Sequence, residues 1–239
     1  MKISGCFLNF TATIFLCLSL FAAKSLQAQE ASKESSSASG PKIFGEFTFT
    51  TNYMEQAISN SNNSYAVQPA LGYQWPTAQI GIRSSNVQFP DNGESLNLRP
   101  YAWYQFIFAA SVDLKVRYDL NMYFASNSRN GDIFRADLNL FTHHLIVENN
   151  SNWYGTGTAA YWLAYGHSWP TPWGIEYKLE AGYLMGNATN YSSYFGIQNG
   201  FGYKYGDFYY ELLGSFNSNA DQFSHMADPA IWLEISTKF

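Results

Sequence analysis

One long run of alternating apolar and polar residues constrains this chain more than any other feature. Between residues 110 and 124 every second residue is apolar, and the residues between them are almost all polar. Successive side chains of a strand point to opposite faces, so the run is typical of a strand with one apolar face. At about 3.3 Å per residue and a tilt of roughly 40°, about 10 to 12 residues cross the hydrocarbon core of a membrane, whereas strands of soluble sheets average about half that length. The run therefore favours a strand that crosses a membrane.

The composition agrees with this interpretation. Aromatic residues make up 18% of the chain and charged residues 13%. After residue 28, however, no stretch approaches the roughly 18 consecutive apolar residues of a membrane-spanning helix. Hydrophobicity distributed in alternation predicts an all-β fold, a transmembrane antiparallel up-and-down β-barrel. Without Lys2 and Lys24, 11 basic residues face 18 acidic ones, a net charge of −7 that gives no reason to expect a nucleic-acid partner.

The alternating segments predict about twelve strands, within a range of roughly 10 to 14, and an even number is typical of bacterial barrels. The count depends on a tight turn near Phe141 and Thr142, without which ten or eleven strands remain. The predicted strands are 43–54, 64–75, 77–87, 96–106, 109–124, 133–142, 144–154, 157–168, 173–185, 193–205, 207–217 and 229–239.

Long polar connections alternate with tight turns such as Trp75–Thr77 and Tyr205–Asp207. Bacterial barrels have long loops outside the cell and short turns in the periplasm, which places both ends of this barrel in the periplasm. Pro69 and Pro100 fall inside predicted strands, and because a closed barrel has no free edge we expect a β-bulge at each. The loops expected outside the cell are 55–63, 87–95, 125–132, 149–156, 186–192 and 218–228.

The amino terminus predicts export. Lys2 followed by the apolar run 14–23 is typical of a secretory signal peptide, which we assign to residues 1–28, with cleavage after Ser25 as an alternative. Residues 29–41 lack core-forming side chains and are expected to be a disordered periplasmic tail, and the barrel is predicted over 42–239. The only cysteines, Cys6 and Cys17, lie in the leader, so the barrel has no thiol for a disulfide or a metal site.

The last strand alternates through Ile231, Leu233 and Ile235 and ends on Phe239. An alternating strand with a terminal aromatic residue looks like the signal by which the barrel-assembly machinery recognises outer-membrane proteins. Phe239 is therefore the predicted assembly signal, and this machinery and the outer-membrane lipids are predicted partners. The expected location is the bacterial outer membrane.

Four segments follow one another in an order that resembles the TorF-like porin family. In that family the first hairpin reads approximately Ser-x-Tyr-x-x-Arg-Gly-Ile-Ser, and a Val-Gln-Gly-Gly strand and a Gly-x-Trp-x-Ser-Asn-Val strand follow. Here Gln56-Ala57 stands where Arg-Gly is usual, and Pro69 where Gly is usual. The resemblance covers most of residues 43–239 and implies an outer-membrane, porin-like protein without naming a solute. The residues that carry it are Thr51-Asn52-Tyr53, Ala57-Ile58-Ser59, Tyr65 to Tyr73 and Ile80 to Val87, continued by Arg117-Tyr118-Asp119, Ala181-Gly182-Tyr183 and Phe239.

The alternation also assigns the charged residues of the strands to one face, which becomes the lumen of a barrel. Eight acidic and eight basic residues nearly cancel, so we predict ion pairs that hold neighbouring strands in register, with a selectivity role for some of them as the alternative. The predicted lumen-lining residues are Glu46, Arg83, Arg99, Asp113, Lys115, Arg117, Asp119, Arg135, Asp137, Glu176, Lys178, Glu180, Lys204, Glu211, Glu234 and Lys238.

Twelve strands lie between the roughly eight that side chains fill and the roughly sixteen that leave an aqueous channel. We therefore predict a narrow, weakly selective pore for the passive passage of small solutes, with no cofactor. Bulky lumen residues that would narrow it are Tyr101, Trp103, Trp162 and Trp232, and residues expected to make room are Gly72, Gly81, Gly182, Gly200 and Gly202. The aromatic residues expected in interfacial girdles are Tyr53, Tyr73, Trp75, Tyr104, Phe106, Tyr161, Tyr165, Trp169, Trp173, Tyr177, Tyr203, Tyr205 and Phe239.

Three alternatives stay open. The first is a plugged barrel with a structural role. The second is an outer-membrane enzyme, a lipid or peptide hydrolase, in which His225 would act with Asp221, Ser224 or Asp228 on one loop. The third is a soluble lipocalin-like barrel, which would reverse the two faces and need shorter strands. No metal site is predicted, because the adjacent His143 and His144 of a strand point to opposite faces.

Overall fold

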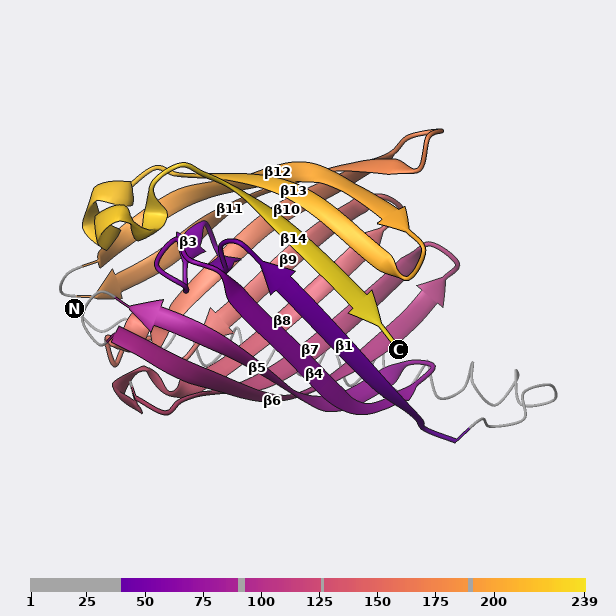
Figure 1. Cartoon of the computed structure of the whole chain (residues 1–239), viewed down its shortest axis with the longest axis horizontal. Helices are drawn as coiled ribbons and strands as arrows, with labels where there is room; N and C mark the ends of the chain where they lie inside the picture. Colours follow the sequence, from indigo (N-terminus) through magenta and orange to yellow (C-terminus); the bar gives the residue numbers. More distant parts are fainter. Residues whose placement is uncertain (1–39, 90–92, 126, 189–190) are drawn as a thin grey trace, which may run out of the picture. The chain divides into compact units, whose positions relative to one another are not determined.

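The computed structural model describes residues 40–239 except 90–92, 126 and 189–190, and residues 41–239 contain a closed antiparallel β-barrel of twelve strands (Figure 1). The predicted signal peptide, residues 1–28, and nearly all of the predicted tail, residues 29–41, lie outside the described residues. No helix in the described part of the chain is long and apolar enough to cross a membrane.

The ring follows chain order, with each strand paired to the next one along the chain and β1 paired to both β4 and β14. Two short strands, β2 (Met54–Glu55) and β3 (Ile58–Ser59), pair only with each other. Three short 3-10 helices lie in the connections: η1 (Asn127–Arg129), η2 (Trp153–Gly155) and η3 (Ala220–Ala227). The twelve strands of the ring are β1 (Lys42–Thr50), β4 (Ala66–Trp75), β5 (Ala78–Phe89), β6 (Gly93–Ala109), β7 (Val112–Tyr123), β8 (Gly131–Leu140), β9 (His143–Asn150), β10 (Ala160–Pro170), β11 (Ile175–Ala188), β12 (Tyr191–Tyr205), β13 (Phe208–Asn217) and β14 (Ala230–Lys238).

The predicted strand number is confirmed, including the tight turn on which it depended. Leu140 pairs with His143, and Phe141 takes the left-handed conformation with φ of 60° between them. Two of the predicted long loops are wrong. In the first, predicted at 87–95, β5 continues to Phe89 and β6 begins at Gly93. In the second, predicted at 186–192, β11 continues to Ala188 and β12 begins at Tyr191.

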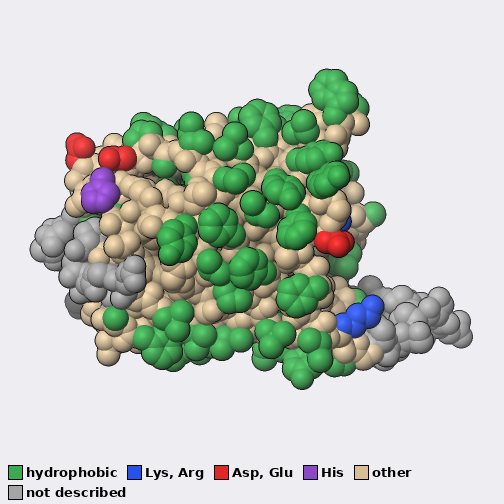
Figure 2. All heavy atoms as spheres, viewed as in Figure 1, with side chains coloured by type: hydrophobic (Ala, Val, Ile, Leu, Met, Phe, Trp, Pro, Cys, Tyr) green, Lys and Arg blue, Asp and Glu red, His purple; other side chains and the backbone are tan. Residues whose placement is uncertain are grey.

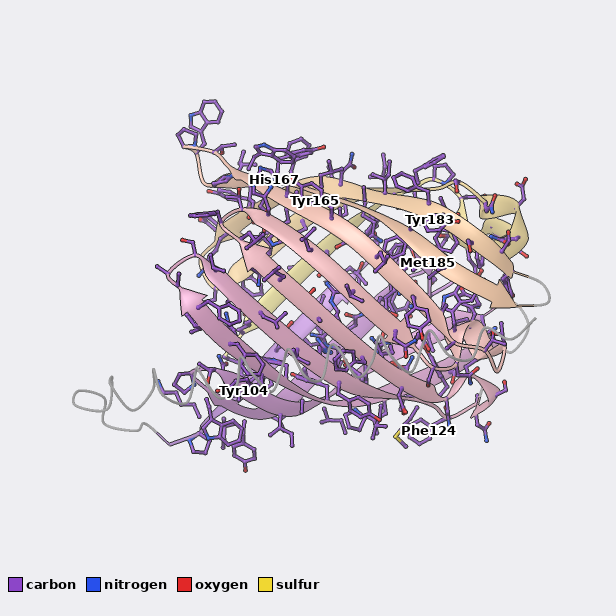
Figure 3. All side chains as sticks on the ribbon, turned by 180° about the vertical axis from the view of Figure 1, so that it is seen from behind. Tyr104, Phe124, Tyr165, His167, Tyr183 and Met185 are labelled. Carbon is purple, nitrogen blue, oxygen red and sulfur yellow. The ribbon has the colours of Figure 1, made fainter. Side chains whose placement is uncertain are left out.

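The outer wall of the barrel is apolar. Hydrophobic side chains cover much of the face drawn in Figure 2, and Figure 3 shows Tyr104, Tyr165, Tyr183 and Met185 on the opposite side of the molecule. Each of these four is more than a third exposed, as expected for side chains that face outward. Exposed apolar side chains on successive strands are what a barrel in a hydrocarbon environment requires.

The bulge predicted at Pro69 is absent. The β4–β5 ladder runs from Ala70 to Trp75 and stops before Pro69, which has no N–H to donate. Beyond it the Asn86 side chain replaces the missing backbone pairs: the Val67 N–H donates to its Oδ1 at 2.7 Å, and its Nδ2 donates to the Tyr65 carbonyl at 3.0 Å. An asparagine side chain thus closes the part of the wall that the proline leaves open.

The bulge predicted at Pro100 is also absent. Pro100 pairs with Ile82 on one side, while on the other side the β6–β7 pairing omits Arg99 and Pro100 and resumes in the same register. The described strands shift register at two other places, between Ile107 and Ala109 and between Leu184 and Asn187.

The last residue closes the seam between the first and last strands. The Phe239 N–H donates to the Gly45 carbonyl at 2.9 Å, and the Gly45 N–H donates to the Phe239 carbonyl at 2.7 Å. The Phe239 ring lies over Gly45, where any side chain would collide with it. Phe239 therefore extends the β1–β14 ladder by one pair, in addition to its predicted role in assembly.

Candidate functional site: the lumen and an inserted segment

Residues 51–65, which we call the inserted segment, fold into the barrel. The sequence placed 55–63 in an external loop, and the structure places much of this stretch inside: Ala57, Ile58 and Ser59 are 1%, 2% and 0% exposed. Figure 1 shows β3 at the end of the barrel that carries η3, away from Phe239. The lumen is therefore occupied at that end.

The tip of the inserted segment is a two-residue hairpin between β2 and β3. Gln56 and Ala57 both take left-handed backbone conformations, with φ of 52° and 61°, as a type I′ turn requires. Glycine is the residue best suited to that conformation, and the resemblance noted above has Gly where this chain has Ala57. In this chain two residues other than glycine occupy the turn.

Polar side chains of the inserted segment satisfy one another. The Ser59 hydroxyl donates to Asn52 Oδ1 at 2.6 Å, and Asn52 Nδ2 donates to Asn63 Oδ1 at 2.9 Å. The Asn63 N–H donates to Ser59 Oγ at 2.8 Å, which completes the cycle. Buried polar groups cost little when they are hydrogen-bonded, so a segment with the composition of an exposed loop can be buried.

An ion pair fixes one side of the hairpin to the wall. Arg99 on β6 donates from Nη1 and Nη2 to the two oxygens of Glu55, at 2.6 and 3.3 Å. Tyr53 and Asn60 each donate to the same carboxylate, at 2.6 and 2.9 Å. Burial alone would raise the pKa of Glu55, but Arg99 and these hydrogen bonds outweigh it and lower the pKa to about 2.

The tip of the hairpin reaches the opposite wall. Gln56 Nε2 donates to Glu148 Oε1 on β9 at 2.6 Å, and β9 lies six strands from β1 in either direction around the ring. The Gln56 carbonyl accepts from the Tyr194 hydroxyl on β12 at 2.7 Å. The inserted segment therefore crosses the whole width of the lumen.

Two further connections cover the inserted segment. Trp153 of η2 and Phe223 and Met226 of η3 join Ile58 and Tyr194 in one buried cluster. Rings pack edge to face at 5.9 Å between the centroids of Trp153 and Phe223. The connections expected as external loops at 149–156 and 218–228 thus pack onto the hairpin and hold it in place.

Little space remains beside the inserted segment. A cavity of about 40 Å³ lies between the hairpin and the wall, bordered by Glu55, Gln56, Asn121, Arg129 and Glu148. One water molecule occupies about 30 Å³ in the liquid. The space between the hairpin and the wall therefore holds about one water molecule.

The Glu55–Arg99 anchor predicts a pH dependence. Because the pKa of Glu55 in the folded state lies below its ordinary value of 4.5, the carboxylate contributes stability above that value and loses it as pH falls toward about 2. We expect the hairpin to loosen within this window, measured as increased proteolysis or solvent labelling of residues 54–59. Glu55→Gln serves as the control and should lack this component. Identical pH profiles for both proteins would contradict the assignment.

Below the inserted segment the lumen opens into a cavity of about 510 Å³. The pairing registers place all sixteen predicted lumen residues on the inward side of their strands, although Lys204 and Lys238 are exposed near the strand ends. The ion pairs among them are Arg117 with Asp119, Arg135 with Asp137, Lys178 with Glu211 and Glu176, and Arg83 and Lys238 with Glu46.

Arg99 pairs with Glu55, but several other members of the predicted set have no ion pair with any described residue. Asp113 accepts a hydrogen bond from Asn139, and Glu180 accepts one from Trp162 Nε1. Lys115 lies over the ring of Trp103, 4.5 Å from its centroid. The ion pairs predicted from the sequence are therefore present for most of the set but not for all of it, and two members without one, Lys115 and Glu180, border the cavity.

The glycines of the lumen make room for neighbouring aromatic rings. A side chain at Gly182 would collide with the Trp162 ring, and one at Gly202 with the Tyr209 hydroxyl. Trp162 and Trp232, predicted to narrow the lumen, are both buried, and Trp162 belongs to the buried cluster that contains Ile58 of the inserted segment. The aromatic–glycine pairs thus flatten the inner surface.

Tyr53, predicted in a girdle, instead belongs to the inserted segment, where it contacts Glu55.

The structure does not bring His225 together with the residues that the sequence suggested as its catalytic partners. No hydrogen bond joins the His225 side chain to Asp221, Ser224 or Asp228 in the described chain, and the His225 carbonyl accepts from Asn63. His143 contacts His167 and Tyr165, whereas His144 contacts Asn139 across the strand. Within the described residues, no three His, Cys, Asp or Glu side chains are arranged to hold a metal ion.

Sequence reasoning missed Glu55 and Glu148. Glu148 stands at an inward position of a strand that was predicted, and the alternation of that strand would have found it. Glu55 carried no such signal, because it lay in a polar segment that resembled an external loop. Its role follows only from the contact with Arg99, 44 residues away.

Solved structures of other proteins share the fold of this chain. No family model matches the chain, and no curated protein matches it either. Among solved structures the KdgM porin is similar, with a TM-score of 0.51 and 10% identity over 82% of this chain and 98% of that chain. KdgM in complex with disordered oligogalacturonate gives a TM-score of 0.50 at 10% identity, covering 83% and 98% of the two chains. A membrane protein from work on in-meso crystallisation gives 0.52 at 8% identity, covering 82% and 83%. These likenesses show that the chain has the fold of a twelve-stranded porin-like barrel.

Proposed function

We propose that this chain is an outer-membrane porin-like protein that forms a narrow, weakly selective pore for the passive passage of small solutes. The observation that carries the proposal is the cavity of about 510 Å³ inside a closed barrel whose outer wall is apolar and whose lumen is lined by charged side chains. An aqueous lumen inside an apolar wall suits a passage through lipid. The similarity in fold to the KdgM porin supports the same activity.

We expect the pore to be narrow because the inserted segment lies in the lumen. A solute has to pass the hairpin, which reaches from its attachment at β1 and β4 to Glu148 on β9 and also contacts Arg99 on β6. Weak ion selectivity follows from the ion pairs of the lumen, because paired charges produce little net field. We also propose that the chain belongs with the TorF-like porins, on the motifs at Thr51-Asn52-Tyr53 and from Ile80 to Val87.

Swelling of proteoliposomes in uncharged solutes tests the proposed function. Liposomes that contain the refolded protein should swell in small polyols and not in trisaccharides, because the hairpin limits the free cross-section. Folding is verified by the shift in electrophoretic mobility on heating that stable barrels show. Well-folded protein whose liposomes swell in no solute would contradict the proposal.

The proposed orientation has a separate test. With long loops outside the cell and tight turns in the periplasm, a cysteine at Ser128 in η1 should react with an impermeant thiol reagent on intact cells. A cysteine at Asp207, in the turn between β12 and β13, should react only after the cells are opened. The predicted mature chain has no cysteine, so labelling has no background. The reverse pattern would show an inverted barrel. The further probe position that the sequence suggested, Asn92, lies outside the described residues.

A further inference from the structure

The charges of the lumen are sorted between two walls. Each inward-facing arginine of the described strands lies on β5 to β8, and each inward-facing glutamate lies on the strands from β9 through β14 to β1. Aspartates neutralise part of the first wall and lysines part of the second. The basic wall carries Arg83, Arg99, Lys115, Arg117 and Arg135, and the acidic wall carries Glu46, Glu148, Glu176, Glu180, Glu211 and Glu234.

Most charges that border the large cavity have an ion-pair partner. Arg135 contacts Asp137 at 2.9 Å and Glu148 at 3.4 Å. Lys178 contacts Glu211 at 2.8 Å and Glu176 at 3.5 Å. In each of these groups one cation lies between two carboxylates, so the cation is fully paired and is not available to a solute.

Lys115 and Glu180 are different. Both border the cavity, they come from different walls, and neither is in an ion pair in the described part of the chain. Each is instead held by a tryptophan: Lys115 lies over the Trp103 ring, and Glu180 accepts from Trp162 Nε1 at 3.3 Å. These contacts orient the ammonium and the carboxylate without neutralising either charge.

A third polar group, the side-chain amide of Gln198, lies beside Glu180. Gln198 pairs with Glu180 across β11 and β12, borders the same cavity, and its Nε2 is buried with no hydrogen-bond acceptor among the described residues. A buried donor without an acceptor costs free energy that a suitable ligand atom would recover. The cavity thus offers a cation, an anion and an amide donor.

We propose that the cavity is a binding site for zwitterionic short peptides on their way through the pore. The ammonium of the peptide pairs with Glu180, a peptide carbonyl accepts from Gln198, and the carboxylate pairs with Lys115. Zwitterions satisfy both unpaired charges at once, whereas a simple anion or cation satisfies one and is repelled by the other. This inference rests on the proposed pore and gives it a substrate class.

Four solutes of similar size separate the possibilities: glycylglycine is zwitterionic, N-acetylglycinamide neutral, N-acetylglycinate anionic and glycylglycinamide cationic. Their uptake into proteoliposomes is measured for the wild-type protein, with potassium chloride conductance of the same preparations as the control for an open pore. We expect glycylglycine to enter several-fold faster than the other three.

Variants that remove one of the two charges should change which solute enters fastest, and the direction of the change depends on the charge removed. Lys115→Gln should favour the cationic solute, because Glu180 remains, and Glu180→Gln should favour the anionic one. The double variant Lys115→Glu/Glu180→Lys restores one charge of each sign and should restore the preference for glycylglycine. If either single variant fails to fold, the other carries the same comparison from the opposite wall.

Equal uptake of all four solutes by the wild-type protein, with normal potassium chloride conductance, would overturn the peptide site and leave the pore intact. A preference for glycylglycine that persists in both single variants would also overturn it. Absence of conductance in the wild-type protein would instead contradict the proposed function on which the inference rests.

Discussion

Removing the hairpin of the inserted segment is expected to raise the conductance of the barrel several-fold. The Asn60 N–H donates to the Tyr53 carbonyl at 2.7 Å, so the two ends of the hairpin already lie side by side. Replacing residues 54–59 with Gly-Ser therefore shortens the segment without straining the wall. A twelve-stranded barrel freed of its inserted segment has a wider aqueous cross-section, and its conductance rises accordingly. The measurement is single-channel conductance in planar bilayers.

Glu55→Gln is the matched control for this deletion. It removes the charge that pairs with Arg99 but keeps the hairpin and the bond from Gln56 to Glu148. We expect a small increase in conductance from this variant and a large one from the deletion. Equal conductance of the deletion variant and the wild-type protein would mean that solutes do not pass the hairpin.

An arginine on the outer wall is expected to cost about 2 to 4 kcal/mol of the free energy of unfolding, as measured for arginine at the midplane of such barrels. Val116 is a suitable site, because it lies in the middle of β7 and pairs with Tyr104 and Ala136, which share its outward face. The measurement is the free energy of unfolding of Val116→Arg in lipid vesicles.

Asn139→Arg introduces the same residue on the inner wall, next to Asp113, to which Asn139 now donates at 2.8 Å. Water and a carboxylate are available there, so we expect a change below about 1 kcal/mol, the usual size for an exposed ion pair. Arg117 is a poorer control, since its partner Asp119 is only 2% exposed and would be left unpaired. Similar losses for Val116→Arg and Asn139→Arg would show that the two faces have been assigned wrongly.

The alternation of residues was sufficient to predict the wall of the barrel. A strand with lipid on one side and water on the other has to alternate, so the parity that put Val116 outside and Arg117 inside follows from local sequence alone. The turn at Phe141 was needed for a count of twelve strands, and the structure confirms it.

The inserted segment could not be predicted by that reasoning. Its position depends on contacts between distant residues, such as Gln56 with Glu148 and Tyr194 with Gln56, which are 92 and 138 residues apart. Its composition of Asn and Ser is that of an exposed loop, and the mutual hydrogen bonds that permit burial appear only in three dimensions. A plugged end and an open end are therefore indistinguishable in the sequence.

The prolines show a different limit. Proline in a closed barrel requires some compensation for the missing donor, and a bulge was the general expectation. The chain uses a side chain at one site, Asn86 beside Pro69, and a gap in the ladder at the other, Pro100. The need for compensation was predictable from backbone chemistry, but its form depended on the neighbouring strand.

Planar-bilayer conductance of the refolded wild-type protein tests the central claim most directly. The account predicts discrete channels of small conductance and weak ion selectivity, because the inserted segment leaves a narrow passage and most lumen charges are paired. Bilayers that stay sealed after insertion of the folded barrel has been verified would contradict the pore, and the chain would then be a plugged barrel.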